Sequence, residues 1–355
     1  MGFSSGGQTP FLKPSGDQGG STDVATINRM ISNGLPVFLI PGEVYYINSP
    51  ILPVNNTFIT GFQWNMSSQD DNYGAGIGQP GGALIRSVNF NGPALIYMPN
   101  QTSQQFYGVD ISGIALYSDA SIGSGVFGIG AFGAWGACFL RGIQIQKSGG
   151  DCLNLDVYSP LGKVPDDWQV TDCKFSGSRH GCGVNVTNNL PDSWFDNCES
   201  SENALDNWKV HWCDNTRWSN CKGENSVGGV GWHFTGNGSA HIAMLTGCSS
   251  QNNFQDGFLF DNSVGGGNGE YILTGCRADG DNTSAGAFAG FHANGSPCRI
   301  MGTGCHSSGA AYGAYEGGAS FGMCFTGSYF SGTTAPTHDD GTNTHALVNQ
   351  SPVPF

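Results

Sequence analysis

The chain has 355 residues, of which 57 are Gly and only 11% are charged, and its formal net charge at pH 7 is −14. With 13 Lys and Arg residues in total, it lacks the positive charge by which nucleic-acid binders reach phosphates. No apolar run is long enough to span a membrane. Abundant Gly together with 38% hydrophobic residues indicates short strands, many turns and a substantial core, which is typical of an all-β protein.

The first 50 residues are predicted to close one end of the fold. Apolar residues at helical spacing predict a helix over residues 22–32. They are Val24, Ile27 and Ile31. Two apolar strands follow, over residues 37–40 and 44–47, and we assign residues 1–50 to an N-terminal arm, a capping helix and these strands. Residues 1–20 are rich in Gly and Ser and contain no apolar segment typical of a signal peptide.

A four-residue phrase then recurs: an apolar residue, then Thr, Ser or Asp, then Gly or Asn, then an apolar residue or Cys. Its ten copies end at positions 62, 114, 143, 173, 198, 221, 248, 276, 305 and 328, so the steps are 23 to 30 residues except for one of 52. Strand-like phrases at this period predict one parallel β-helix over residues 51–332. We interpret the 52-residue step as two turns, which gives about ten or eleven turns. Residues 333–355 lose the repeat and are assigned to a C-terminal tail or cap.

The cysteines follow the same repeat. Six of the 12 share the last position of the phrase, namely Cys173, Cys198, Cys221, Cys248, Cys276 and Cys305. In a solenoid such residues stack at about 4.8 Å, and a buried free Cys behaves as a small hydrophobe. We therefore predict a reduced interior ladder rather than disulfides. A metal or redox array is disfavoured because no His shares the position.

A second strand follows each phrase by nine to eleven residues, and its side chains alternate between the two faces. The inward pairs are predicted to be Leu153/Leu155, Val184/Val186, Trp208/Val210, Trp232/Phe234, Phe258/Phe260 and Phe291/Ala293. One outward column then contains Asn154, Asn185, Lys209, His233, Leu259 and His292. The neighbouring outward column contains Asp156, Thr187, His211, Thr235, Asp261 and Asn294. Just before the strand, Asp151, Asp206 and Asp256 share a further position.

The N-terminal segment resembles the entry of the pectate-lyase-like superfamily. The resemblance rests on Gly16-Asp17 and Thr22-Asp23 around a turn, and on the sequence Phe-Leu-Ile-Pro-Gly-Glu-Val-Tyr at residues 38–45. Together with the later repeats it covers most of the chain and implies a single right-handed parallel β-helix. This superfamily includes polysaccharide lyases, polygalacturonase-type hydrolases, fructan-transforming enzymes and phage tailspike depolymerases.

The polygalacturonase residues are not all present, so that mechanism is not transferred. The segment Gly149-Gly150-Asp151-Cys152 has one Asp where that family has a consecutive pair. His180-Gly181 is similar to the His-Gly element of the family, but no Arg-Ile-Lys follows it.

The outward side chains are compatible with two mechanisms. Hydrolysis would take its acid and base from four carboxylates, namely Asp206, Asp256, Asp156 and Asp261. Asp206 and Asp256 are two turns apart, roughly 9–10 Å, which approaches the carboxylate separation of inverting glycosidases. Lyase chemistry would use Lys209, His211 or His233 as the base, beside a group that stabilises an enolate-like intermediate. The simpler interpretation is that the aspartates form turns and the histidines are solvated.

Four residues are predicted to contact the glycan: Trp212, Trp168, Asp167 and Asn185. Aromatic rings at a surface stack on sugar faces, whereas Trp208 and Trp232 are expected to point inward. The acidic net charge slightly favours a neutral glycan, because it repels polyanions until salt screens it. No cofactor is required by either mechanism, and a calcium ion on surface carboxylates stays an option without a recognisable ligand cluster.

The leading hypothesis is therefore a polysaccharide-degrading enzyme, either a glycoside hydrolase or a polysaccharide lyase, acting in a groove along the solenoid. Display on a phage tail would make it virion-associated or extracellular. The rival hypothesis is a non-enzymatic adhesin or structural tail protein that binds glycan or assembles as a homotrimer. A fructan-type transferase is a third alternative, because one fold hosts all of these functions.

Overall fold

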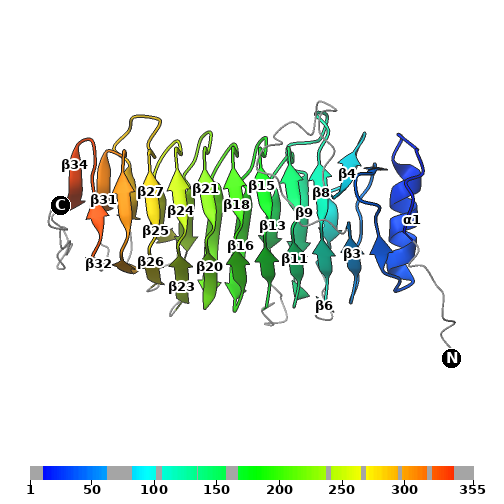
Figure 1. The fold of residues 1–355 in the computed structure, drawn as a ribbon, viewed down its shortest axis with the longest axis horizontal. Coiled ribbons are helices and arrows are strands. Elements are labelled where there is room, and N and C mark those ends of the chain that lie inside the picture. Colours follow the sequence, from blue (N-terminus) through cyan, green and yellow to red (C-terminus); the bar gives the residue numbers. More distant parts are fainter. Residues whose placement is uncertain are drawn as a thin grey trace.

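The structure is a computed structural model, and it describes residues 11–61, 82–100, 106–133, 135–156, 167–236, 241–264, 269–294, 298–317 and 322–339. It is a right-handed parallel β-solenoid, which confirms the predicted fold class. Figure 1 shows the strands succeeding one another along the long axis, with a helix at the N-terminal end. Three long parallel sheets run along this axis, with 11, 11 and 10 described strands.

The strands are assigned to the sheets as follows. The first sheet contains β1 (Val37–Phe38), β3 (Phe58–Thr60), β7 (Asp110–Ser112), β11 (Phe139–Arg141), β14 (Gln169–Thr171), β17 (Trp194–Asp196), β20 (Thr216–Ser219), β23 (His241–Thr246), β26 (Gly269–Thr274), β29 (Cys298–Thr303) and β32 (Gly322–Thr326). The second contains β2 (Val44–Ile47), β4 (Ala83–Ser87), β8 (Ile114–Tyr117), β12 (Gln144–Gln146), β15 (Lys174–Ser176), β18 (Glu199–Ser201), β21 (Lys222–Glu224), β24 (Ser249–Gln251), β27 (Arg277–Asp279), β30 (His306–Ser308) and β33 (Tyr329–Phe330). The third contains β5 (Ala94–Met98), β9 (Phe127–Phe132), β13 (Leu153–Asp156), β16 (Val184–Pro191), β19 (Trp208–Asp214), β22 (Trp232–Gly236), β25 (Phe258–Val264), β28 (Ala289–Asn294), β31 (Tyr312–Glu316) and β34 (Ala335–Asp339). A separate short pair joins β6 (Phe106–Tyr107) to β10 (Trp135–Gly136).

The N-terminal helix, α1 (Ser21–Ser32), forms as the apolar spacing predicts and lies at the end of the solenoid (Figure 1). Its buried side chains include Val24, Ile27 and Ile31. Asp23, also buried, accepts hydrogen bonds from the backbone amides of Ser15 (2.7 Å) and Tyr46 (3.1 Å). The helix is thus bonded to the first strands as well as packed against them.

The sheets extend beyond the limits expected for the solenoid. Strands β1 and β2 lie within residues 1–50, and β34 lies within residues 333–355, where it pairs with β31. The interpretation of the 52-residue step was wrong for the first sheet, because Ile59 of β3 pairs directly with Ile111 of β7. That step is one turn with a long excursion, since a parallel sheet tolerates insertions between strands without losing register.

The corner between the first and second sheets explains the repeated phrase. Its third residue has a left-handed backbone, with φ of 50° at Asn220 and 63° at Gly247. Gly and Asn adopt this conformation more readily than other residues. The corner turns the chain so that the fourth residue points into the core, which is why Cys so often occupies that position.

The predicted cysteine ladder is confirmed. All six ladder cysteines are buried and have free thiols. Their thiols donate to nearby carbonyls, as Cys221 does to Ser219 (3.3 Å), and burial raises the pKa of the Cys173 and Cys221 thiols well above the ordinary value. The ladder cysteines therefore fill core volume between successive turns.

Aromatic rings stack along the inner face of the third sheet. The predicted inward pairs are all buried, and the strands keep Trp208, Trp232, Phe258 and Phe291 in one register. The rings of Trp208 and Trp232 are stacked at 4.7 Å with an interplanar angle of 4°. Each turn thus buries its largest side chains against the equivalent side chains of its neighbours.

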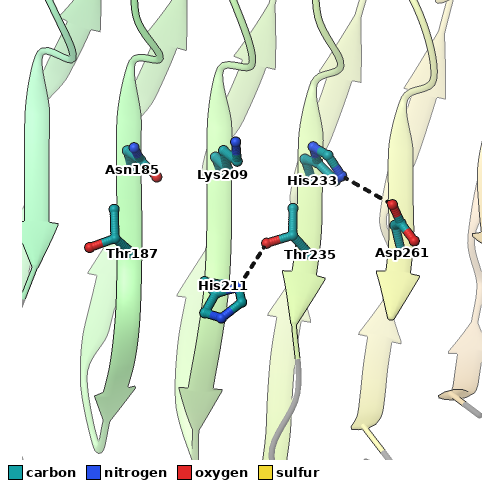
Figure 2. Close-up of a pocket in the computed structure, with 7 residues that line it drawn as sticks. All are labelled: Asn185, Thr187, Lys209, His211, His233, Thr235 and Asp261. Atoms are coloured by element: carbon teal, nitrogen blue, oxygen red, sulfur yellow. Dashed lines mark hydrogen bonds and ion pairs between the residues drawn. The ribbon is translucent and has the colours of Figure 1, made fainter. Parts of the chain in front are cut away.

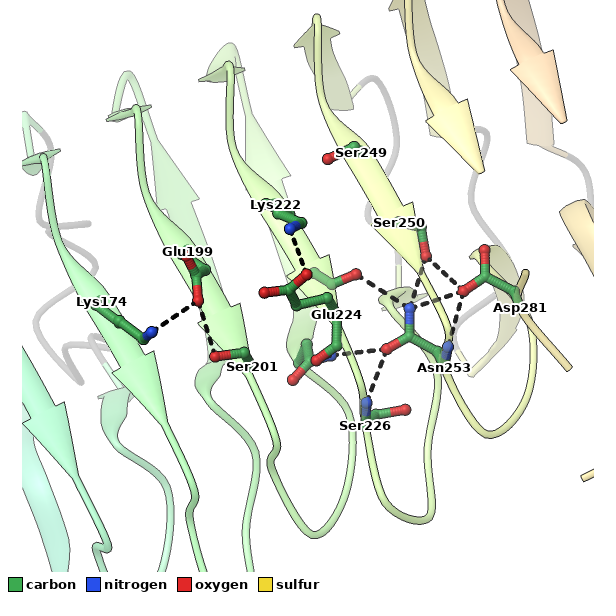
Figure 3. A network of polar contacts seen from close by, with 12 residues as sticks. Lys174, Glu199, Ser201, Lys222, Glu224, Ser226, Ser249, Ser250, Asn253 and Asp281 are labelled. Carbon is green, nitrogen blue, oxygen red and sulfur yellow. Dashed lines mark hydrogen bonds and ion pairs between the residues drawn. The ribbon is translucent and has the colours of Figure 1, made fainter. Parts of the chain in front are cut away.

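A buried polar ladder lies inside the turn from the second to the third sheet, part of which Figure 3 shows. Asn203 donates to Asn207, Asn207 to Asn253 and Asn253 to Asp281, each at 2.8 Å between the amide nitrogen and the acceptor oxygen. Asp281 Oδ2 is buried without a hydrogen-bond partner. Burial raises the pKa of Asp281 to about 7, because its ionised form loses hydration.

The stability of the protein should therefore decrease as pH rises toward and through 7. Because the pKa of Asp281 is higher in the folded state than the ordinary value of 3.8, the folded state binds the proton more tightly between these two values. Each pKa unit corresponds to about 1.4 kcal/mol, so Asp281→Asn should raise the free energy of unfolding by a few kcal/mol at pH 8 relative to wild type. The difference should shrink at pH 4. Urea unfolding at both pH values measures it, with the exposed Asp196→Asn as the control. An unchanged pH dependence in Asp281→Asn would contradict this.

Thiol chemistry should separate the core cysteines from the surface one. Among the cysteines whose side chains the structure describes, ten are buried with free thiols and Cys324 is exposed. In the native protein a maleimide should modify Cys324 and leave these ten unmodified, because modification needs an accessible thiolate. Peptide mass spectrometry before and after denaturation measures this. Rapid native labelling at Cys221 or Cys248 would refute the closed ladder.

Candidate functional site

A cavity of about 380 Å³ opens on the outer face of the third sheet. It spans four neighbouring strands, β16, β19, β22 and β25, and Figure 2 shows the side chains that line it. They are Asn185, Thr187, Lys209, His211, His233, Thr235 and Asp261. All seven belong to the two outward columns that strand alternation predicts. The cavity thus collects ionisable and hydroxyl groups from turns that are far apart in sequence.

The position of these side chains follows from the core. On β19 and β22 the rings of Trp208 and Trp232 point inward, so Lys209 and His233, which follow them, point outward. The parallel register pairs Lys209 with His233. One strand spacing, about 4.8 Å, therefore separates the backbones that carry the cation and the imidazole.

His233 is held in one orientation by a carboxylate. Its Nδ1 lies 2.8 Å from Asp206 Oδ2, and both side chains are mostly buried, with exposures of 19% and 13%. Because the carboxylate accepts at Nδ1, a neutral ring carries its proton there and keeps a lone pair on Nε2. Nε2 has no hydrogen-bond partner, is shielded from solvent and lies 4.0 Å from Asp261 Oδ2 (Figure 2). This arrangement leaves one ring nitrogen without a hydrogen-bond partner beside the cavity.

Asp206 belongs to a repeated clamp between turns. Its Oδ1 accepts from the backbone amide of Val230 at 3.0 Å. Asp256 accepts from the amide of Ala289 (2.6 Å) and from His292 Nδ1 (3.1 Å) in the same way. Asp151 forms the third example, with Cys182 N (2.7 Å) and Asn185 Nδ2 (2.9 Å). An Asp just before a strand thus bonds to the next turn and orients the side chain that lies above it.

The aspartates predicted to form an acid–base pair do not meet in the cavity. Asp206 and Asp256 are not among its lining residues, and Asp256 is only 2% exposed. Asp156 accepts a hydrogen bond from Asn188 and is also outside the lining. Asp261 does line the cavity. Within the described part of the chain, the lining therefore contains one carboxylate, two imidazoles and one ammonium group.

His211 is the second imidazole of the cavity. Its Nδ1 lies 3.2 Å from Thr235 Oγ1 (Figure 2). Burial lowers the pKa of His211 below the ordinary value of 6.5, and the positive charge of Lys209 lowers it further. The ring is therefore neutral at pH 7. Lys209 itself forms no ion pair with any residue that the structure describes, so its charge stays available to a ligand.

Of the residues predicted to contact glycan, Asn185 lines the cavity and the others do not. Trp168 is fully buried and its Nε1 donates to the carbonyl of Trp135 at 2.8 Å. The prediction that Trp168 stacks on sugar was therefore wrong, because its ring is part of the core. Asp167 is exposed at a corner with φ of 63° and is not a lining residue. The side chain of Trp212 lies outside the described residues.

Sequence reasoning did not name Thr187 and Thr235 as site residues, although it placed both in the outward columns. Thr235 contacts His211, and both threonines line the cavity. The signal that could have found them is their register beside His211 and Asp261.

Among the residues that the structure describes, no group of three or more His, Cys, Asp or Glu side chains could hold a metal ion. No described helix is long and apolar enough to cross a membrane.

The comparisons with known proteins place the fold. No family model matches the chain, and no curated protein sequence matches it. Among solved structures, it is similar to the A-module of a mannuronan C-5 epimerase from Azotobacter vinelandii, with a TM-score of 0.59 and 12% identity, covering 94% of this chain and 97% of that one. It is also similar to the gp42 tailspike of Acinetobacter phage vb_AbaP_AS12, with a TM-score of 0.57, 12% identity and coverage of 98% and 65%.

A third similar structure is the gp49 tailspike of Acinetobacter baumannii bacteriophage Fri1, described as a capsular polysaccharide depolymerase. The TM-score is 0.55 at 14% identity, and the match covers 96% of this chain and 62% of that one. The chain thus spans less than two thirds of either tailspike. At these identities the similarity shows the fold alone.

The close approach of Gly236 to His211 can be tested by substitution. A Cβ atom there would lie 2.5 Å from the carbonyl oxygen and 2.6 Å from Nδ1 of His211. Gly236→Ala should therefore displace the His211 ring and destabilise the fold by about 1–3 kcal/mol. Imidazole NMR signals and the midpoint of urea unfolding measure the two effects. Gly125→Ala is the matched control, because a Cβ at Gly125 meets nothing within 4 Å. Unperturbed His211 signals in Gly236→Ala would disprove the contact.

Proposed function

We propose that this protein is a polysaccharide-degrading enzyme, that its glycan binds at the cavity on the third sheet, and that the reaction is β-elimination at a uronate residue. The observation that carries the proposal is His233, whose Nδ1 is held by Asp206 at 2.8 Å while its Nε2 has no hydrogen-bond partner. A base oriented by a carboxylate, with a cation on the adjacent strand, is suited to removing a proton next to a carboxylate.

The proposed steps use residues of the cavity. Binding of the glycan must first expose His233 Nε2, which is shielded from solvent in this structure. Nε2 then takes the proton from the carbon that bears the uronate carboxylate, and Lys209 neutralises the negative charge that develops on that carboxylate. The electron pair then forms a carbon–carbon double bond as the bond to the glycosidic oxygen breaks. The imidazolium of His233, stabilised by Asp206 and by nearby Asp261, returns its proton to the leaving oxygen. No water is consumed, and the products are a shortened chain and an unsaturated uronate.

Hydrolysis has less support in this cavity. Glycosidases use two carboxyl groups, about 5–5.5 Å apart when retaining and about 6.5–9.5 Å apart when inverting. Asp261 is the one carboxylate among the described lining residues, while Asp206 is engaged by Val230 and His233. We therefore assign Asp206 and Asp256 to positioning histidines rather than to attacking or protonating the glycan.

Lys209 is the group of the cavity that would meet an acidic substrate. The net charge of −14 favours a neutral glycan at long range, but Lys209 provides a local positive charge without an ion pair to a described residue. The lining also contains the carboxylate of Asp261, so the preference for a uronate rests on direct contact with Lys209 and not on the overall charge of the cavity. The names of similar structures are consistent with this class, because mannuronan is a polyuronate and one tailspike is described as a capsular polysaccharide depolymerase. A virion-associated or extracellular location and a homotrimer belong to the same proposal.

Activity should be sought on polymers that differ in charge. Polygalacturonate, alginate and hyaluronan, with dextran and xylan as neutral controls, are incubated with the protein while reducing ends and unsaturated-uronate absorbance are recorded together. We expect both signals on one of the three uronate-containing polymers. His233→Ala and Lys209→Met should each reduce the rate at least about 100-fold, which is a common contribution of one positioned acid–base group. His306→Ala, on the second sheet, should leave the rate unchanged.

Each other outcome has a defined meaning. Reducing ends without the absorbance would replace elimination by hydrolysis and return attention to the aspartates. Deuterium exchange at the uronate carbon in D₂O without chain cleavage would keep His233 as the base but make the protein an epimerase. No product and no exchange on any polymer would refute an enzyme of this substrate class.

A further inference from the structure

The outward column that contains Lys209 and His233 continues toward the C-terminal end of the solenoid. The register pairs His233 with Leu259, Leu259 with His292, His292 with Tyr315 and Tyr315 with His338. These residues lie on β22, β25, β28, β31 and β34, and Figure 1 shows β25, β31 and β34 following one another toward the C-terminus. The surface beyond the cavity therefore changes from charged to aromatic along one line.

The rings of this segment pack against one another in ordered pairs. His292 and Tyr315 are stacked, with ring centroids 4.5 Å apart and an interplanar angle of 16°. Tyr312 and His338 are stacked at 4.8 Å and 23°, and Tyr315 contacts His338 at 4.8 Å. We call these four residues, His292, Tyr312, Tyr315 and His338, the aromatic platform. All four are partly exposed.

Two features indicate that the platform does not belong to the core. The inward positions of the same strands hold Phe291 and Ala314, both fully buried, so the core is closed without the platform rings. His292 is also anchored from beneath, because the buried Asp256 accepts from its Nδ1 at 3.1 Å. A ring that is held in this way but remains partly exposed presents a fixed edge to a ligand, because its face is covered by the neighbouring ring.

We infer that the aromatic platform is a second binding subsite, which receives pyranose rings of the same glycan chain several residues from the bond that reacts. This inference rests on the proposed function. The backbone step from His233 to Tyr315 is three strand spacings, about 14 Å, which is the length of a few sugar residues. Leu259 lies between them, half-buried, so this column carries no charged side chain between His233 and His292.

The platform offers hydroxyl groups and ring edges to a sugar. The phenol groups of Tyr312 and Tyr315 can hydrogen-bond to sugar hydroxyls, while the exposed ring edges add an uncharged surface. Asn294, exposed in the neighbouring column, adds an amide at the edge. Charge recognition is thus assigned to Lys209 at the cavity, and recognition of hydroxyl groups to the platform.

The subsite predicts a dependence on glycan length that Tyr315 controls. The probes are size-fractionated tri- to octasaccharides of polygalacturonate, alginate and hyaluronan, titrated calorimetrically into the His233→Ala variant so that no cleavage occurs. Adding Tyr315→Ala should weaken binding of the octasaccharide about tenfold and leave the trisaccharide unchanged. Tyr315→Phe should weaken octasaccharide binding by a smaller factor, because the phenol group is lost while the ring is kept.

The matched control is Tyr329→Ala. Tyr329 is exposed and stacks on His306 at 5.2 Å, but this pair lies on the second sheet, away from the cavity. It should not change binding of any probe. Melting temperatures of both alanine variants confirm that the fold is retained.

The outcomes separate the subsite from the proposed function. Equal affinities of Tyr315→Ala and its parent for the octasaccharide, or equal weakening at every length, would overturn the subsite even if the wild type cleaves the polymers. Length-dependent binding through Tyr315 without any cleavage by the wild type would support the subsite and refute the enzyme. Absence of binding by every probe would overturn both.

Discussion

The stacking of Trp208 on Trp232 inside the solenoid determines where Lys209 and His233 lie outside it. The side chains of a strand alternate with period two, so a shift of one residue would exchange the two faces completely. The rings at 4.7 Å and 4° make that exchange costly, because it would expose two indoles and bury an ammonium group and an imidazole. The cavity is therefore the outer counterpart of an aromatic core, and its geometry is as well determined as that core.

Contacts between turns serve stability and the site together. Asp206 bonds to the backbone of Val230 and to His233 with its two oxygens. The first contact joins two turns, and the second selects the tautomer of a candidate base, as second-shell carboxylates do for functional histidines. Asp256 does the same for His292 at the start of the aromatic platform. At this position of the repeat, one Asp side chain therefore does two things: it joins two turns, and it orients the histidine of the next turn.

The sequence predicts well which side chains share a column, but it predicts poorly which residues each side chain contacts. Alternation and the repeat place Lys209, His211 and His233 on one face, because both depend only on spacing along the chain. The partner of Asp206 is a residue of the next turn, and that contact depends on the corner between the sheets, which spacing does not describe. Trp168 shows the same limit. It follows a segment of irregular length, so its burial cannot be derived from the period.

The direct pairing of Ile59 with Ile111 clarifies what a period does and does not measure. The repeat reports the distance between equivalent strands only where the connecting turns are short, and an excursion changes the spacing in sequence without changing the spacing in space. Register is held by the core, so an excursion can be inserted at a turn while each column remains intact. The length of a turn can thus change without changing which side chains line up on neighbouring strands. One solenoid can therefore carry a charged cavity and an aromatic platform along the same line.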